Sequence, residues 1–140
     1  TRQGKGRQDE AKECKMILIF GGAYQGKLDF AKEKFNISDE EVFKCTETGE
    51  LDFSKRVIYS AELFFLKCVN ENIEAADFLR EKIDQLRDKI IIVCDISQGI
   101  VPMEPVHRAW REACGRAMMY LAGEADEVYR VFCGLGQRIK

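Results

Sequence analysis

A glycine-rich segment that ends in a lysine is the part of this sequence best suited to phosphate chemistry. Residues 20–29 read FGGAYQGKLD and follow the pattern G-x-x-x-x-G-K-[ST] from Gly21 through Lys27. In such a loop, backbone N–H groups surround the phosphate oxygens, the next helix adds its N-terminal dipole, and the lysine meets the β and γ oxygens. The expected nucleotide-binding residues are Gly21, Gly22, Ala23, Tyr24, Gln25, Gly26, Lys27 and Leu28.

The last of these positions departs from the pattern. The pattern requires a Ser or Thr whose hydroxyl ligates Mg²⁺, whereas Leu28 has no oxygen to offer. Asp29 carries an oxygen, but one helical step turns it by ~100° from that position, so it is not assigned as a replacement ligand. Nucleotide binding remains the expectation, whereas the prediction of efficient phosphoryl transfer is weakened. The alternative is a tight turn at Gly21-Gly22 followed by a surface lysine.

An acidic partner for the loop is expected at Asp95, directly after the apolar run 90–93. Ligands of open α/β sheets bind beyond the carboxyl ends of the strands. Asp95 could hold Mg²⁺ through water there, as the acid of a Walker B strand does, and we assign it with Lys27 as a catalytic residue. The alternative is that Asp95 only caps a turn or a helix.

Apolar patterning predicts the elements that hold these residues. Short apolar or alternating runs indicate strands at 16–20, 42–46, 56–60, 90–93 and 127–133. Helical periodicity indicates helices at 27–35, 61–88 and 104–122, the second with its likeliest break at 70–72. Strands that alternate with helices predict an α/β fold of three layers, similar to P-loop NTPases, with a mostly parallel sheet and right-handed crossovers. A turn is expected at 134–136.

Length and composition favour one compact domain over 16–140. Residues 1–15 are polar and are expected to be a disordered arm or an addition to the natural chain, which would then start at Met16. A net charge of −2 with 33% charged residues argues against nucleic acid or a membrane surface as the partner. No apolar run approaches the ~18 residues of a membrane span.

The cysteines and the one histidine bear on location and metal chemistry. Six cysteines lie far apart without a C-x-x-C pair, which we interpret as reduced thiols in a cytoplasmic protein. With His107 as the only histidine, a Cys/His zinc site lacks its usual pattern. Trp110 falls on the apolar face of the last helix, where core packing is the expected role.

Both ends of the chain resemble one family, the bifunctional adenosylcobinamide kinase/adenosylcobinamide-phosphate guanylyltransferases of cobalamin biosynthesis. The segment 17–31 is similar to the family's opening, whose loop reads G-G-A-R-S-G-K-S. The ending 93–140 is similar to the family's N-E-V-G-x-G-I-V-P segment and the helix and strand after it, with Asp95 at the family's Glu. The residues in step there are Gly99, Ile100, Val101, Pro102, Arg111, Gly115, Leu121, Ala122, Ala125, Asp126, Val128, Gly134 and Lys140.

The resemblance implies a P-loop-type kinase that uses ATP or GTP with Mg²⁺, takes cobinamide or another corrinoid as acceptor, and assembles as a homotrimer. Two departures bear on the chemistry. The family's guanylylated histidine has no counterpart, because residues 47–55 contain no histidine and His107 is out of register. A covalent phosphoramidate needs an imidazole, so the guanylyltransferase step is expected to be lost.

The kinase step is altered as well, because Tyr24-Gln25 stands for the family's Arg-Ser and Leu28 for its final Ser. The sequence therefore predicts a nucleotide-binding, cobinamide kinase-like protein. The alternatives are a non-catalytic relative that keeps the scaffold for ligand binding or assembly, and a kinase for another small alcohol.

Overall fold

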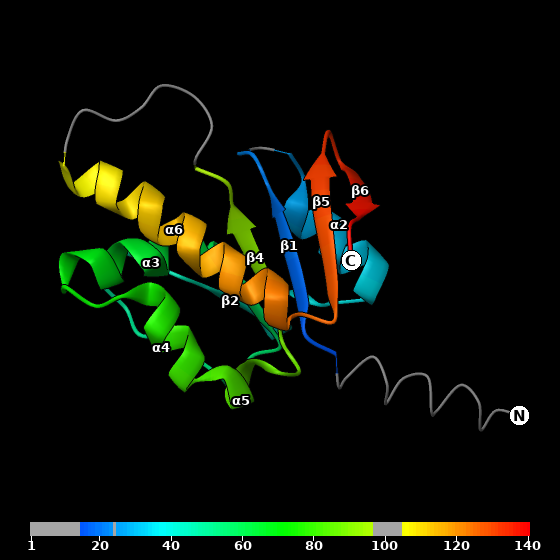
Figure 1. Ribbon diagram of the computed structural model, residues 1–140. Coiled ribbons are helices and arrows are strands. Elements are labelled where there is room, and N and C mark those ends of the chain that lie inside the picture. Colours follow the sequence, from blue (N-terminus) through cyan, green and yellow to red (C-terminus); the bar gives the residue numbers. More distant parts are fainter. Residues whose placement is uncertain (1–14, 24, 97–104) are drawn as a thin grey trace, which may run out of the picture.

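The computed structural model describes residues 15–23, 25–96 and 105–140, and a single mixed sheet organises them (Figure 1). The strands are β1 (Ile17–Gly21), β2 (Val42–Lys44), β3 (Val57–Tyr59), β4 (Ile90–Cys94), β5 (Glu127–Phe132) and β6 (Leu135–Arg138). The helices are α2 (Lys27–Phe35), α3 (Ala61–Asn70), α4 (Ala75–Glu81), α5 (Ile83–Leu86) and α6 (Pro105–Glu124), with a 3₁₀ turn at Asp39–Glu41. The strand order is β2-β3-β4-β1-β5-β6.

All neighbouring strands pair in parallel except β6, which returns antiparallel to β5. Helices cover both faces of this sheet, as Figure 1 shows, with α3, α4 and α6 on one side and α2 on the other. The result is the three-layered α/β architecture that the sequence predicts.

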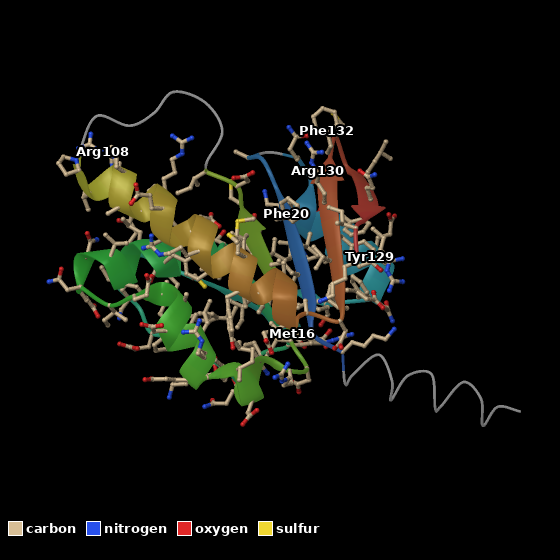
Figure 2. The ribbon with its side chains drawn as sticks, viewed as in Figure 1. Met16, Phe20, Arg108, Tyr129, Arg130 and Phe132 are labelled. Carbon is tan, nitrogen blue, oxygen red and sulfur yellow. The ribbon has the colours of Figure 1, made fainter. Side chains whose placement is uncertain are left out.

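Strand β1 lies between β4 and β5 and is buried from both faces. Its side chains alternate, with Leu18 in the apolar cluster beneath α3, α4 and α6, and Ile17 and Ile19 in the cluster beneath α2. Figure 2 marks Phe20 on β1 and Tyr129 on β5, which belong to the first and the second cluster respectively. Two-sided burial explains why this strand reads as an unbroken apolar run.

The chain leaves β1 and β4 toward opposite faces of the sheet. From β1 it passes through α2 on one face to β2, and from β4 it passes through α6 on the other face to β5. The loops after these two adjacent strands therefore separate at the carboxyl end of the sheet. Such a switch point is where open α/β sheets bind their ligands.

Gly21 ends β1 at a point where no side chain fits. A Cβ at this position would lie 2.4 Å from the backbone oxygen of Val131 on β5. The backbone oxygen of Gly21 also accepts a 2.7 Å hydrogen bond from the N–H of Asp95, which extends the β1–β4 pairing by one step. Glycine is therefore needed here for close packing of three strands.

Most predicted elements are confirmed, with shifts of one or two residues at the ends. The break in 61–88 falls at Asn70, and Asn72 there has a left-handed backbone with φ of 60°. Three predictions were wrong in detail. The second strand stops at Lys44, and residues 135–136 belong to β6 rather than to a turn. The segment 61–88 forms three helices rather than one or two, because a further break falls at Lys82. The turn lies at Cys133 and Gly134, both with positive φ. No helix in the described part of the chain is both long and apolar enough to cross a bilayer.

The glycine at the end of β1 gives a stability test. Gly21→Ala forces backbone movement against β5, so we expect a loss of about 1–3 kcal/mol in the free energy of unfolding. Gly115→Ala is the matched control, because a Cβ on this exposed glycine of α6 meets nothing within 4 Å. Gly115→Ala should raise the free energy of unfolding by up to about 1 kcal/mol, because alanine has a higher helix propensity than glycine. Urea denaturation measures both, and equal effects of the same sign would contradict the packing argument.

Candidate phosphate-binding site

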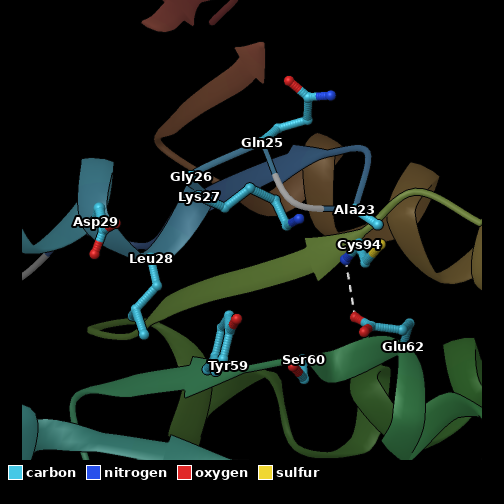
Figure 3. Close-up of a pocket in the computed structure, with 10 residues that line it drawn as sticks. All are labelled: Ala23, Gln25, Gly26, Lys27, Leu28, Asp29, Tyr59, Ser60, Glu62 and Cys94. Carbon is cyan, nitrogen blue, oxygen red and sulfur yellow. Dashed lines mark hydrogen bonds between the residues drawn. The ribbon is translucent and has the colours of Figure 1, made fainter. Parts of the chain in front are cut away.

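A pocket of about 440 Å³ opens at the switch point between β1 and β4 (Figure 3). The loop after β1, the start of α2, the end of β3, the start of α3 and the last residue of β4 form its wall. The lining residues are Ala23, Gln25, Gly26, Lys27, Leu28, Asp29, Tyr59, Ser60, Glu62 and Cys94. Five of the eight predicted nucleotide-binding positions therefore line one cavity, namely Ala23, Gln25, Gly26, Lys27 and Leu28.

Lys27 occupies the first turn of α2 and is buried, with 8% of its surface exposed. Its ammonium donates a 2.8 Å hydrogen bond to the backbone oxygen of Gly22, so the side chain reaches back across the loop. Within the described residues it makes no ion pair. A buried cation with one neutral partner favours an anion beside it, because the anion offsets the cost of removing the charge from water.

Gly26 is the residue that lets the loop enter α2. Its φ of 83° lies in the left-handed region that glycine adopts without strain, and its oxygen accepts the first helical hydrogen bond, from Phe30 N at 2.9 Å. The N–H groups of the first helical turn have no partners within the helix and point toward its N-terminal end. Together with the helix dipole, they make this end of α2 suited to phosphate.

Gln25 connects the loop to the β5–β6 turn. Its side-chain oxygen accepts a 2.6 Å hydrogen bond from Cys133 N, and its backbone oxygen accepts one of 2.8 Å from Gly134 N. Figure 3 shows the Gln25 side chain pointing away from Lys27. Gln25 thus fixes the shape of the loop instead of reaching a ligand through its side chain.

Leu28 stands where a metal-ligating hydroxyl is expected and packs as an apolar residue. It is half-buried against the cluster beneath α2, and in Figure 3 it extends toward Tyr59. No group of three His, Cys, Asp or Glu side chains placed to hold a metal ion occurs in residues 15–23, 25–96 and 105–140. Any Mg²⁺ here would rely on one or two carboxylates, water and the phosphates themselves.

The predicted acid, Asp95, lies beside the pocket, one residue beyond Cys94. Its N–H is bonded to Gly21, which places its backbone next to the end of β1. Among described residues, the carboxylates that line the cavity are Asp29, which is exposed, and Glu62, which is buried. Sequence reasoning missed Glu62 because it assigned the residue only to an amphipathic helix, although Glu62 follows a predicted strand almost directly.

The remaining sequence candidates divide into three groups. Gly22 contributes its oxygen to Lys27, and Tyr24 lies outside the described residues. His107 is exposed in the first turn of α6, with its ring 6.2 Å from that of Trp110. Trp110 is half-buried against the core and donates a 2.7 Å hydrogen bond from its ring to the Glu62 backbone oxygen. Core packing of Trp110 is confirmed, with a contact to the pocket wall in addition.

Comparison with known proteins shows the family to which the chain is related. Residues 53–139, more than half of the chain, match the model of the cobinamide kinase / cobinamide phosphate guanyltransferase family. The chain belongs to this family. The matched part of this family member includes Ser60, Glu62, Cys94 and Asp95, while the glycine loop precedes it.

One curated relative is the bifunctional adenosylcobalamin biosynthesis protein CobU of Salmonella typhimurium strain LT2. It is 37% identical to this family member over 51 residues, which are 36% of this chain and 28% of the relative. The match thus spans under a third of the relative's length. The predicted family and α/β fold are confirmed.

The reactivity of the Cys94 thiol measures how accessible the pocket is to reagents. Burial raises the pKa of its thiol, Glu62 and Asp95 raise the pKa further, and Lys27 opposes them. A raised pKa lowers the reactive thiolate fraction at neutral pH. Cys133 lies on the exposed β5–β6 turn.

We therefore expect a maleimide at pH 7 to label Cys133 at least about tenfold faster than Cys94. Peptide mass spectrometry over time measures both rates. Equal rates at the two residues would contradict the partial burial of Cys94.

Proposed function

We propose that this protein binds the triphosphate of a purine nucleotide in the β1–β4 pocket. We further propose that it transfers the γ-phosphoryl group to the side-chain hydroxyl of cobinamide or a related corrinoid. The observation that carries the proposal is Lys27, a buried ammonium at a helix N-terminus with one neutral hydrogen-bond partner. Family membership supplies the acceptor class, and the pocket of about 440 Å³ suits a small-molecule ligand.

Each part of the site has a separate role in this proposal. The backbone of the glycine loop and the first turn of α2 hold the phosphates, and Lys27 neutralises charge on the transferring group. Asp95 would hold Mg²⁺ through water. When bound, Mg²⁺ would supply positive charge that offsets the charge of the phosphates.

The guanylyl-transfer step is absent in this proposal. His107 lies on the exposed surface of α6, and the pocket lining given above holds no imidazole. We expect no phosphoramidate after incubation with GTP labelled at its α-phosphate, detected as acid-labile radioactivity on the protein. Acid-labile label that His107→Asn removes would overturn this part of the proposal.

Nucleotide binding is tested by calorimetry with ATP and GTP, with and without Mg²⁺. Lys27→Ala should weaken binding about 10- to 100-fold, because a charge-assisted hydrogen bond contributes about 1.5–3 kcal/mol. Lys34→Ala is the matched control, since Lys34 is an exposed lysine of the same helix. No saturable binding by the parent at millimolar nucleotide would leave the glycine loop as a turn and end the kinase proposal.

A second candidate function rests on Leu28. Its packing on the core converts the metal-ligand position into a structural one, as expected of a non-catalytic member that keeps the scaffold for ligand binding or assembly. Such a member would bind nucleotide without Mg²⁺ dependence and transfer no phosphoryl group. The acidic Asp95 at the end of β4, together with the buried Lys27, favours the kinase over this candidate.

Restoring the hydroxyl tests whether the loop holds the phosphates. If the loop holds a triphosphate, Leu28→Ser should increase the ratio of ATP affinity with Mg²⁺ to that without it, because it adds an oxygen ligand. Leu28→Ala is the control, with a similar packing loss of about 1–2 kcal/mol but no hydroxyl. An unchanged ratio in Leu28→Ser, relative to Leu28→Ala, would place the phosphates elsewhere. Calorimetry gives the ratio, and thermal unfolding gives the packing loss.

A further inference from the structure

Glu62 is a buried acid at the pocket wall that the proposed function leaves unused. It lies in the first turn of α3, directly beyond the carboxyl end of β3, and 9% of its surface is exposed. Acidic side chains are rarely buried to this degree unless they are paired. Figure 3 shows its carboxylate and the Lys27 side chain at the same cavity, one from α3 and the other from α2.

Three local features fix the position of Glu62. Its Oε1 accepts a 2.8 Å hydrogen bond from Cys94 N, and its backbone oxygen accepts the bond from Trp110. Ser60, two residues earlier, has a left-handed backbone with φ of 61°, which is costly for a residue other than glycine. Among the described residues, the only hydrogen bond to its carboxylate is the one that Oε1 accepts, and Glu62 lines the cavity.

The strand order sets the distance between Glu62 and the loop. β3 is separated from β1 by β4 alone, and neighbouring strands lie about 4.8 Å apart. The backbone of Glu62 therefore starts about 10 Å across the sheet from the loop after β1. Its carboxylate reaches back over the end of β4, where it accepts the bond from Cys94 N, and it faces the cavity that Lys27 enters from the other side. Asp95, in contrast, continues β4 itself and bonds through its N–H to the end of β1.

We propose that Glu62 is the general base that activates the acceptor hydroxyl, an inference that rests on the proposed function. The Glu62 carboxylate takes the proton of the acceptor hydroxyl. At the same time, the oxygen of that hydroxyl forms a bond to the γ-phosphorus of the nucleoside triphosphate. The bond from that phosphorus to the β–γ bridging oxygen breaks, leaving a nucleoside diphosphate and a phosphate monoester. The proton then passes from Glu62 to water.

Glu62→Gln tests this role with little change of shape, because the amide oxygen can still accept the bond from Cys94 N. The transfer rate kcat should fall by about 10²- to 10⁴-fold, the usual contribution of a general base. Binding of ATP without Mg²⁺ should tighten about three- to tenfold relative to ADP, because a negative charge that faces the γ-phosphate is lost. Calorimetry measures the ratio of ATP to ADP affinity, and corrinoid phosphorylation measures kcat.

Two further variants control for charge and for folding. Glu33→Gln removes an equal charge from an exposed residue of α2 that does not line the pocket, so it should change the ratio of ATP to ADP affinity little. Glu62→Asp keeps the charge but withdraws it by one methylene, so it should fold and bind as the parent does and transfer more slowly. Circular dichroism confirms folding of each variant.

The outcomes separate this inference from the proposed function. If the parent binds and transfers, and Glu62→Gln does both equally well, only the role of Glu62 is overturned. If Glu62→Gln weakens ATP and ADP alike, Glu62 is structural and the inference is again overturned. If the parent binds without transfer, an unchanged ratio of ATP to ADP affinity in Glu62→Gln overturns it. If the parent binds no nucleotide, the proposed function fails and this inference fails with it.

Discussion

The close packing of β1 between β4 and β5 is the constraint on which the rest of the structure depends. Parallel pairing on both sides requires apolar side chains on both faces, and it requires a glycine where β1 ends against Val131. The backbone beyond Gly21 is held by Asp95 N on one side and approaches β5 on the other. The loop therefore starts from a fixed point and a fixed direction, which is what a phosphate-binding backbone needs.

The buried carboxylate of Glu62 depends on the same sheet, but α3 and α6 position it in the pocket. Glu62 is held by a backbone N–H of β4 and by the ring of Trp110 from α6. Two core elements and one strand end thus determine where a single carboxylate lies. Trp110 has a packing role and a positioning role together, and its helical spacing alone reveals only the first.

The sequence predicts this fold well because burial leaves a strong periodic signal. The apolar runs 16–20 and 90–93 are visible without a structure, as is the break at Asn70. β6 was missed because its side chains are all exposed and its second residue is Gly136, so its pairing with β5 alone makes it a strand. Glu62 was missed for a related reason: its importance depends on strand order, which places β3 two positions from β1, and a chain read residue by residue does not contain that order.

The hydrogen bonds of Gln25 tie the loop to a hairpin tip that carries two exposed apolar side chains, Phe132 and Leu135. Figure 2 marks Phe132 at the upper end of β5. Because these bonds join the loop to the tip, restricting the motion of one also restricts the motion of the other. Thermodynamic linkage then works in both directions, so a ligand that immobilises the loop also lowers the entropic cost of ordering the tip for whatever contacts it. The outer edge of the sheet and the ligand pocket are in this sense one cooperative unit.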